Sequence, residues 1–236
     1  MKSEMRKALK EAYEAPMPQH KKEFISKLDK PQLSTYSFVL QQTAYIRKRV
    51  WILSFLILAV AIWGTSYVGQ DSVWVISSMM PFVALCAITE NARSMTYGMA
   101  ELEMASRFSL KSIMLARIGI IGIFHFAVFC ILIPFVGSNS LIPFARTGLY
   151  LFVPYMLSST LGLWAVRRFQ DIDATYLCMV TSAIVCLLNV ILKNIISGYY
   201  EEQKVIWWVI AAVYFMVKTW NEYKKTISQT EELLWN

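Results

Sequence analysis

Long apolar stretches are the feature that most constrains how this chain of 236 residues can fold. A helix rises about 1.5 Å per residue, so crossing roughly 30 Å of hydrocarbon takes about 20 mostly apolar residues. Stretches of this kind occur six times, at residues 50–69, 73–89, 113–137, 147–166, 174–194 and 205–220. Only 17% of the residues are charged, whereas a soluble domain has about a quarter. We therefore expect an all-α, multi-pass membrane protein with six transmembrane helices within residues 50–223.

Lysine and arginine are distributed unevenly between the loops that join these stretches. If the N-terminus is cytoplasmic, all but three of the 23 lysines and arginines fall on the cytoplasmic side, the exceptions being Arg146, Lys193 and Lys204. Cytoplasmic loops carry the excess of positive charge in multi-pass proteins, so both termini are predicted to be cytoplasmic. The net charge of +7 fits a face beside anionic membrane lipids. Nucleic-acid binding would not explain the apolar stretches, and we expect no nucleic-acid partner.

Residues 1–49 form a charged leader, and residues 224–236 form a short cytoplasmic tail. The end of the leader has an apolar face that includes Tyr36 and Leu40, which predicts an interfacial helix lying flat on the membrane before the first span. The alternative is that the first span begins earlier in the chain. Gln41 and Gln42 would be costly within hydrocarbon, which favours the interfacial helix.

Residues 90–112 are the most polar run in the middle of the chain. Apolar residues recur there every three or four positions, which predicts a cytoplasmic helix with one apolar face; they are Ala92, Met95, Met99, Leu102, Ala105 and Phe108. Glu103 and Arg107 are spaced as an i,i+4 ion pair in the favoured order. A solvated loop covering the helix ends is the simpler alternative. The length of the run, and an apolar face that only the leader or a partner could cover, favour the helix.

Sequence motifs of common catalytic sites are missing from the chain. There is no phosphate-binding loop, no Gly-x-Ser-x-Gly and no His-Glu-x-x-His, and the four cysteines do not have metal-ligand spacing. We expect no catalytic residue, and no metal or cofactor bound by this chain. His125 and Asn189 are polar groups inside predicted spans, which makes them candidates for a translocation path. A hydrogen bond to a neighbouring helix is the simpler interpretation of each.

The order of these segments resembles the six-span permease subunits of bacterial ABC-2-type exporters. The resemblance implies that residues 90–112 contain the coupling helix, which docks on a separately encoded ABC ATPase that binds ATP and Mg²⁺. It implies a location in the bacterial cytoplasmic membrane and a pairing with a second permease copy or a paralogue. The residues that it assigns to the contact with the ATPase are Met95, Met99, Glu101, Leu102, Glu103 and Arg107.

The function expected from this resemblance is that of a non-catalytic permease subunit. Such a subunit forms the translocation path of an ATP-driven exporter, here for an amphipathic drug, peptide or lipid. The alternative is a six-span assembly, immunity or sensor subunit that transports nothing. A third possibility, an intramembrane enzyme, is disfavoured because the spans lack paired catalytic groups.

Overall fold

The computed structural model describes residues 35–68, 72–96, 110–139, 142–169, 173–196 and 198–232. These residues form seven α-helices and one 3-10 helix, with no β-strand among them. Residues 38–236 group as one compact unit, and residues 1–37 group separately. Of the separate group only residues 35–37 are described, and they belong to the first turn of α3.

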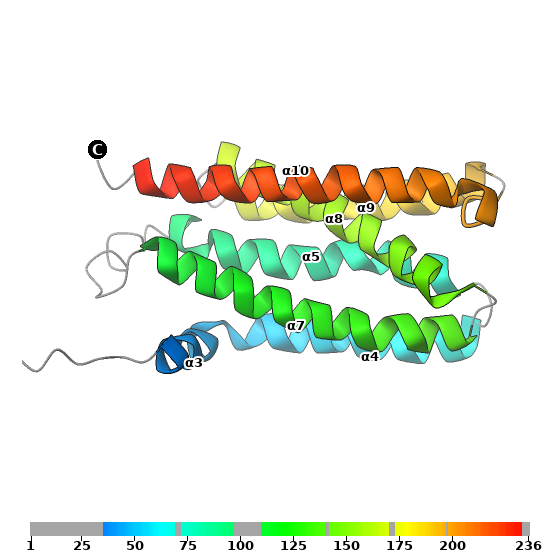
Figure 1. Cartoon of the computed structure of the whole chain (residues 1–236), viewed down its shortest axis with the longest axis horizontal. Helices are drawn as coiled ribbons and strands as arrows, with labels where there is room; N and C mark the ends of the chain where they lie inside the picture. Colours follow the sequence, from blue (N-terminus) through cyan, green and yellow to red (C-terminus); the bar gives the residue numbers. More distant parts are fainter. Residues whose placement is uncertain are drawn as a thin grey trace, which may run out of the picture. The chain divides into compact units, whose positions relative to one another are not determined.

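Consecutive helices from α4 to α10 run in opposite directions (Figure 1). In chain order the elements are α3 (Thr35–Tyr45), α4 (Lys48–Val68), α5 (Ser72–Thr96), α7 (Leu110–Asn139), α8 (Phe144–Arg168), α9 (Asp173–Ile195), the 3-10 helix Glu202–Lys204 and α10 (Val205–Glu232). We call the end where α4, α7 and α9 begin the basic end, because Arg47, Lys48, Arg49, Arg167, Arg168, Lys224 and Lys225 lie there. The opposite end carries Tyr199 and Tyr200, and we call it the tyrosine end.

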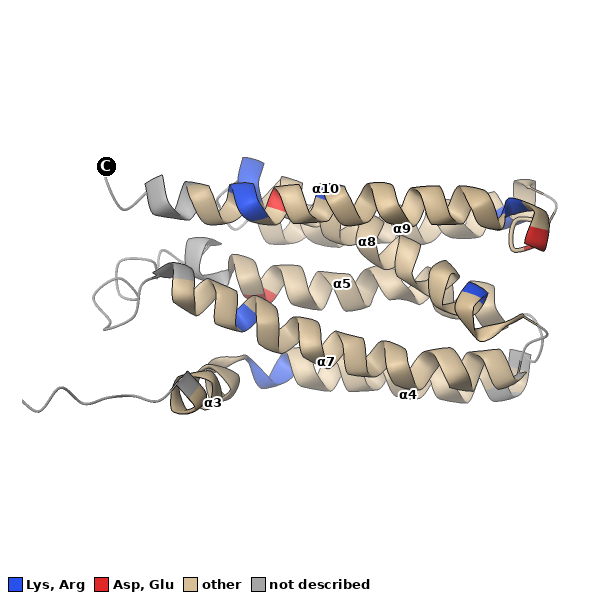
Figure 2. Cartoon of the chain, in the orientation of Figure 1, with Lys and Arg blue, Asp and Glu red and all other residues tan. Residues whose placement is uncertain are grey.

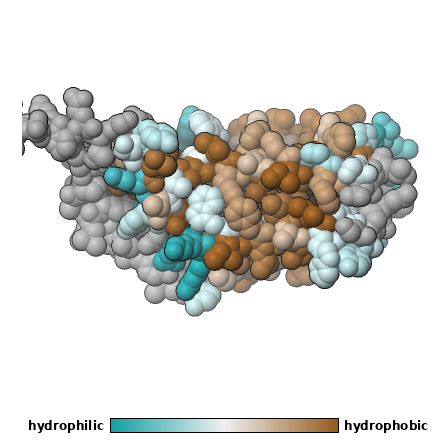
Figure 3. Space-filling model, turned by 90° about the horizontal axis from the view of Figure 1, so that it is seen from below, coloured by the Kyte–Doolittle hydropathy of each residue, from teal (hydrophilic) through white to brown (hydrophobic). Residues whose placement is uncertain are grey.

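Five helices are long and apolar enough to cross a membrane, which identifies a multi-pass membrane protein. Their spans are Lys48–Thr65, Ser72–Ala92, Ser112–Ser138, Phe144–Arg168 and Ala174–Ile195, close to the first five predicted ranges. Charged residues lie toward the helix ends (Figure 2), and one face of the molecule shows apolar residues gathered between polar ones (Figure 3). The sixth predicted span, 205–220, forms the first part of α10. Charged residues follow from Lys218 onward, and this span stays a prediction.

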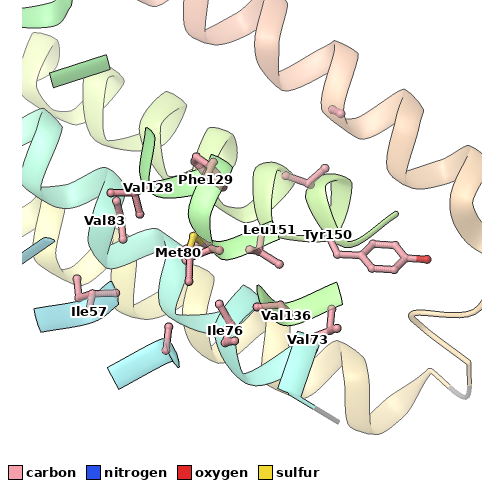
Figure 4. Packing of buried hydrophobic residues seen from close by; sticks show 14 of the residues in the cluster. Ile57, Val73, Ile76, Met80, Val83, Val128, Phe129, Val136, Tyr150 and Leu151 are labelled. Atoms are coloured by element: carbon pink, nitrogen blue, oxygen red, sulfur yellow. The ribbon is translucent and has the colours of Figure 1, made fainter. Parts of the chain in front are cut away.

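The central element of the fold is α5, which packs against α4, α7, α8 and α9. Its buried residues Ile76, Met80 and Val83 meet side chains of α7 and α8 in the main hydrophobic cluster (Figure 4). Leu151 of α8 and Leu132 of α7 are fully buried in this cluster. Because α5 contacts four neighbours, its position determines how the other helices sit around it.

Small residues allow α5, α8 and α9 to approach one another closely. Ser158 Oγ donates to the carbonyl oxygen of Pro81 at 3.2 Å and lies 3.0 Å from Ser182 Oγ. A Cβ at Gly162 would clash with the Ile88 side chain. The run of small residues from Ser158 to Gly162 therefore brings three helices together, as small residues commonly do between membrane helices.

The helix is interrupted at Ile46 and Arg47, between α3 and α4. The first apolar helix consequently begins at Lys48 and does not extend back through the polar pair Gln41 and Gln42, which differs from the early-start alternative. Arg47 N–H donates to Glu90 Oε1 of α5 at 3.4 Å. The interruption between α3 and α4 thus lies against the last part of α5. Whether α3 rests on a membrane surface stays a prediction.

Candidate functional site

A cavity of about 250 Å³ lies between α7, α8 and α10. Each helix contributes a pair of lining residues four positions apart: His125 and Phe129, Tyr155 and Ser159, Thr219 and Tyr223. Residues at this spacing share one face of a helix, so each pair faces the same space. One face of each of three helices therefore contributes to the cavity wall.

His125 is the most unusual residue of the cavity wall. Its side chain is only 2% exposed, and its Nδ1 lies 3.0 Å from the Tyr155 hydroxyl oxygen. Its Nε2 is buried and has no hydrogen-bond partner within the described part of the chain. Buried polar atoms are almost always paired, so this nitrogen retains a hydrogen-bonding capacity that the fold leaves unused. The simpler sequence interpretation, a bond to a neighbouring helix, holds for Nδ1 only.

A second cavity of about 470 Å³ adjoins the first, because Met156, Thr219 and Tyr223 line both. Its other lining residues are Met216, Val217 and Trp220 of α10. None of the described residues that line either cavity is charged. Mostly apolar walls with a few polar groups are typical of small-molecule sites.

The wall formed by α10 is fixed to α8 by polar contacts beside the cavity. Thr219 Oγ1 donates to the carbonyl oxygen of Phe215 at 2.7 Å and lies 2.7 Å from Thr160 Oγ1. One turn further along, Arg167 Nε donates to Glu222 Oε2 at 2.9 Å. These contacts hold α10 against α8 beside the cavity.

Asn189 belongs to a different polar cluster, toward the tyrosine end. Its Nδ2 donates to Ser77 Oγ at 3.0 Å and to Ser78 Oγ at 3.3 Å, and its Oδ1 accepts from the Tyr200 hydroxyl at 3.0 Å. Burial raises the pKa of the Tyr200 phenol, which keeps this hydroxyl protonated and able to donate. Asn189 is not among the residues lining the cavity of His125, so the two predicted path residues do not meet.

Aromatic rings hold the segment between α9 and α10 against the helices. Tyr200 lies with its ring centroid 5.1 Å from that of Tyr150 and 5.6 Å from that of Trp208. Trp208 Nε1 donates to the carbonyl oxygen of Tyr199 at 3.1 Å. Gly198 has φ of 66°, a left-handed conformation that favours glycine and that the turn requires. The segment between α9 and α10 is therefore held in place by a cluster of aromatic side chains.

The predicted contact with an ATPase falls almost entirely outside the described residues. Met95 lies in the last turn of α5, and residues 97–109 are not described; they include Met99, Glu101, Leu102, Glu103 and Arg107. Sequence reasoning did not identify Tyr155, Ser159, Thr219 or Tyr223. The signal that would have found them is the pairing of polar residues four positions apart within the fourth apolar stretch and at the end of the sixth.

Across the residues that the structure describes, no three His, Cys, Asp or Glu side chains are grouped closely enough to hold a metal ion. Comparison with known proteins gives no match to this chain: neither a family model, nor a curated protein, nor a solved structure is similar to it.

Proposed function

We propose that the chain is the membrane-spanning permease subunit of an ATP-driven exporter, with a separate ATPase docking on residues 90–112. The observation that carries this proposal is the position of the cavity relative to that segment. The segment follows α5 in the chain and leads into α7, and α7 carries His125 in the cavity wall. A displacement of residues 97–109 would reach the cavity directly through α7, and through α5 only by way of its packing against α8.

Contacts of the last part of α5 support its role as the moving element. Glu90 is 2% exposed and accepts the Arg47 N–H at the break between α3 and α4. The guanidinium carbon of Arg117, in α7, lies 5.3 Å from the centroid of the Tyr45 ring. The end of α3, the last part of α5 and the first turns of α7 thus lie close to one another. Coupling needs an element with two arrangements that the partner biases, and this group of helix ends is a suitable one.

The charge distribution supports a cytoplasmic basic end. Most described lysines and arginines lie at that end, whereas Arg146, Lys193 and Lys204 lie toward the tyrosine end. With this orientation both termini are cytoplasmic and the docking segment can reach a cytoplasmic ATPase. Residues 205–220 of α10 then form the sixth span. Lys193 Nζ lies 4.5 Å above the Trp74 ring, a position suited to the outer boundary of the membrane.

Apolar side chains on the outside of the helices support contact with membrane lipid and with a second permease subunit. Phe55 and Trp63 of α4, and Leu187 of α9, are more than half exposed. Exposed apolar surface of this extent fits contact with lipid, and part of it is available for a second permease copy or a paralogue.

The proposal is tested by purifying the tagged full chain from its native membrane and measuring ATP hydrolysis in the eluate. Glu101→Lys combined with Leu102→Asp is expected to remove both the ATPase subunit and the activity. Glu201→Lys combined with Gln203→Asp makes the same changes in charge at exposed positions of the tyrosine end and is expected to retain both. Equal ATPase recovery with the two variants would refute docking on this segment, and an ATPase-free native complex would favour an assembly or sensor subunit.

A further inference from the structure

We propose that the cavity between α7, α8 and α10 binds a neutral, aromatic amphipathic molecule whose one hydrogen-bonding group meets His125. The inference rests on the proposed function in one respect, that this molecule is the class of substrate transported. Binding itself requires only the cavity and no ATPase.

The position of the polar contact follows from the hydrogen bonds already made. Tyr155 engages Nδ1 of His125 and so fixes the imidazole ring, and Nε2 remains without a partner among the described residues. Thr219, another polar residue of the wall, already donates to a backbone carbonyl of its own helix. A ligand group that reaches His125 Nε2 would satisfy this nitrogen, and Ser159 and Tyr223 are the further polar residues of the wall. That nitrogen donates or accepts according to the tautomer, which suits an amide or an alcohol.

The cavity walls select against a charged ligand. An ion placed there would lose its hydration without meeting an opposite charge, because no charged side chain lies among the described lining residues. The walls favour an aromatic ligand, since rings of Phe126, Phe129, Phe152 and Tyr155 surround the space. Phe129 and Tyr155 already meet edge to face, with centroids 5.3 Å apart at 90°.

The size of the space fits a small molecule. Drug-sized ligands occupy pockets of about 300–1,000 Å³. The first cavity, about 250 Å³, is a neighbour of the second, about 470 Å³, and the two share Met156 and Thr219 in their walls. Methionine side chains adapt to ligands of different shape, which suits a site for a class of molecules.

Gly122 offers a way to fill the cavity without disturbing the fold. It lines the cavity, and apart from its own helix no heavy atom lies within 4 Å of the position that a Cβ would take. Gly64 of α4 is equally open and lines neither cavity. Gly122→Leu and Gly64→Leu are thus a matched pair: both add the same side chain to an open helical position, and only the first enters the proposed site.

The test is photolabelling of the full chain in phosphatidylcholine nanodiscs with a benzamide that carries an aryl diazirine. We expect saturable labelling of peptides from α7, α8 and α10 that unlabelled benzanilide competes. Gly122→Leu should reduce this labelling at least about tenfold and Gly64→Leu should leave it unchanged. His125→Phe should weaken binding about tenfold, because it removes one buried hydrogen bond.

Non-saturable labelling spread over the lipid-facing helices, or labelling that Gly122→Leu leaves intact, would overturn the inference. Labelling that only added phospholipid competes would assign the cavity to a lipid chain and would also overturn it. Saturable labelling in a chain that recruits no ATPase keeps this site and refutes the proposed function. ATP-driven transport that Gly122→Leu does not alter refutes this site and leaves the proposed function standing.

Discussion

Replacing Asn189 with leucine tests the polar cluster that joins α5, α9 and the segment after α9. The substitution removes three hydrogen bonds while keeping a side chain of similar size. The Ser77 and Ser78 hydroxyls still donate to backbone carbonyls. They lose only the hydrogen bond that their Oγ atoms accept from Asn189. The Tyr200 hydroxyl loses its Asn189 acceptor and keeps Ser77 as a hydrogen-bonding neighbour.

The magnitude follows from these losses. Interhelical hydrogen bonds in membrane proteins average about 0.6 kcal/mol, so three contribute about 2 kcal/mol. The weaker pairing of the buried Tyr200 hydroxyl adds about 1 kcal/mol, and the extra apolar burial of leucine offsets part of the loss. We expect Asn189→Leu to lower the free energy of unfolding by about 2–3 kcal/mol. The measurement is reversible unfolding in mixed micelles, in which rising dodecyl sulfate is followed by circular dichroism.

The matched control is Asn194→Leu, the same change at an exposed position of the same helix, which should alter stability by less than about 0.5 kcal/mol. Combining Asn189→Leu with Tyr200→Phe should cost about 1 kcal/mol less than the sum of the two single changes, because they share a hydrogen bond. Strict additivity, or equal effects at positions 189 and 194, would refute the reasoning.

Three further changes have defined outcomes. Gly162→Leu should destabilise the chain by about 2 kcal/mol or more in the same unfolding assay, since its side chain would clash with Ile88. Glu222→Gln should cost about 1 kcal/mol there, because Arg167 loses a partly buried ionic partner but keeps a neutral acceptor. Burial raises the pKa of the Tyr200 phenol above that of the unfolded chain, about 10, so its contribution to stability persists below about pH 10 and is lost as the pH rises further. Unfolding measured from pH 7 to pH 11 should show a smaller decline for Tyr200→Phe than for the wild type.

Each of these changes has its own control. Gly64→Leu introduces the same side chain into open space and should not destabilise, so a loss as large as at Gly162 would contradict the packing argument. Glu201→Gln removes an exposed carboxylate and should have little effect, and parity with Glu222→Gln would contradict a role for the ion pair. Identical pH profiles for the wild type and Tyr200→Phe would show that the phenol does not titrate differently on folding.

Apolar length made the helices predictable. The second stretch, for example, was expected at 73–89 and the helix there is Ser72–Thr96, because burial in hydrocarbon constrains the middle of a span more than its ends. The interruption of the helix before Lys48 was also foreseeable, since Gln41 and Gln42 are poorly suited to hydrocarbon. The length of α10 could not be predicted in this way, because its last turns are charged. Apolar composition gives no signal for a helix that continues beyond the apolar run.

The candidate site was predictable only in part. His125 and Asn189 stand out as polar residues in apolar stretches, but Tyr155 lies 30 residues from His125, and Ser77 and Ser78 lie more than 100 residues from Asn189. Periodicity shows which residues share a face of one helix and does not show which helices meet. The cavity depends on that second kind of information, since His125, Tyr155 and Thr219 come from three helices.

ATP-driven transport by the purified complex tests the central claim most directly. The complex is reconstituted into inside-out phosphatidylcholine vesicles with the basic end outward, and uptake of radiolabelled benzanilide is followed after addition of ATP and Mg²⁺. The account predicts ATP-dependent accumulation that Glu101→Lys with Leu102→Asp abolishes and that Glu201→Lys with Gln203→Asp retains. Steady ATP hydrolysis without accumulation of the amide, or accumulation that persists in the Glu101 and Leu102 variant, would contradict it.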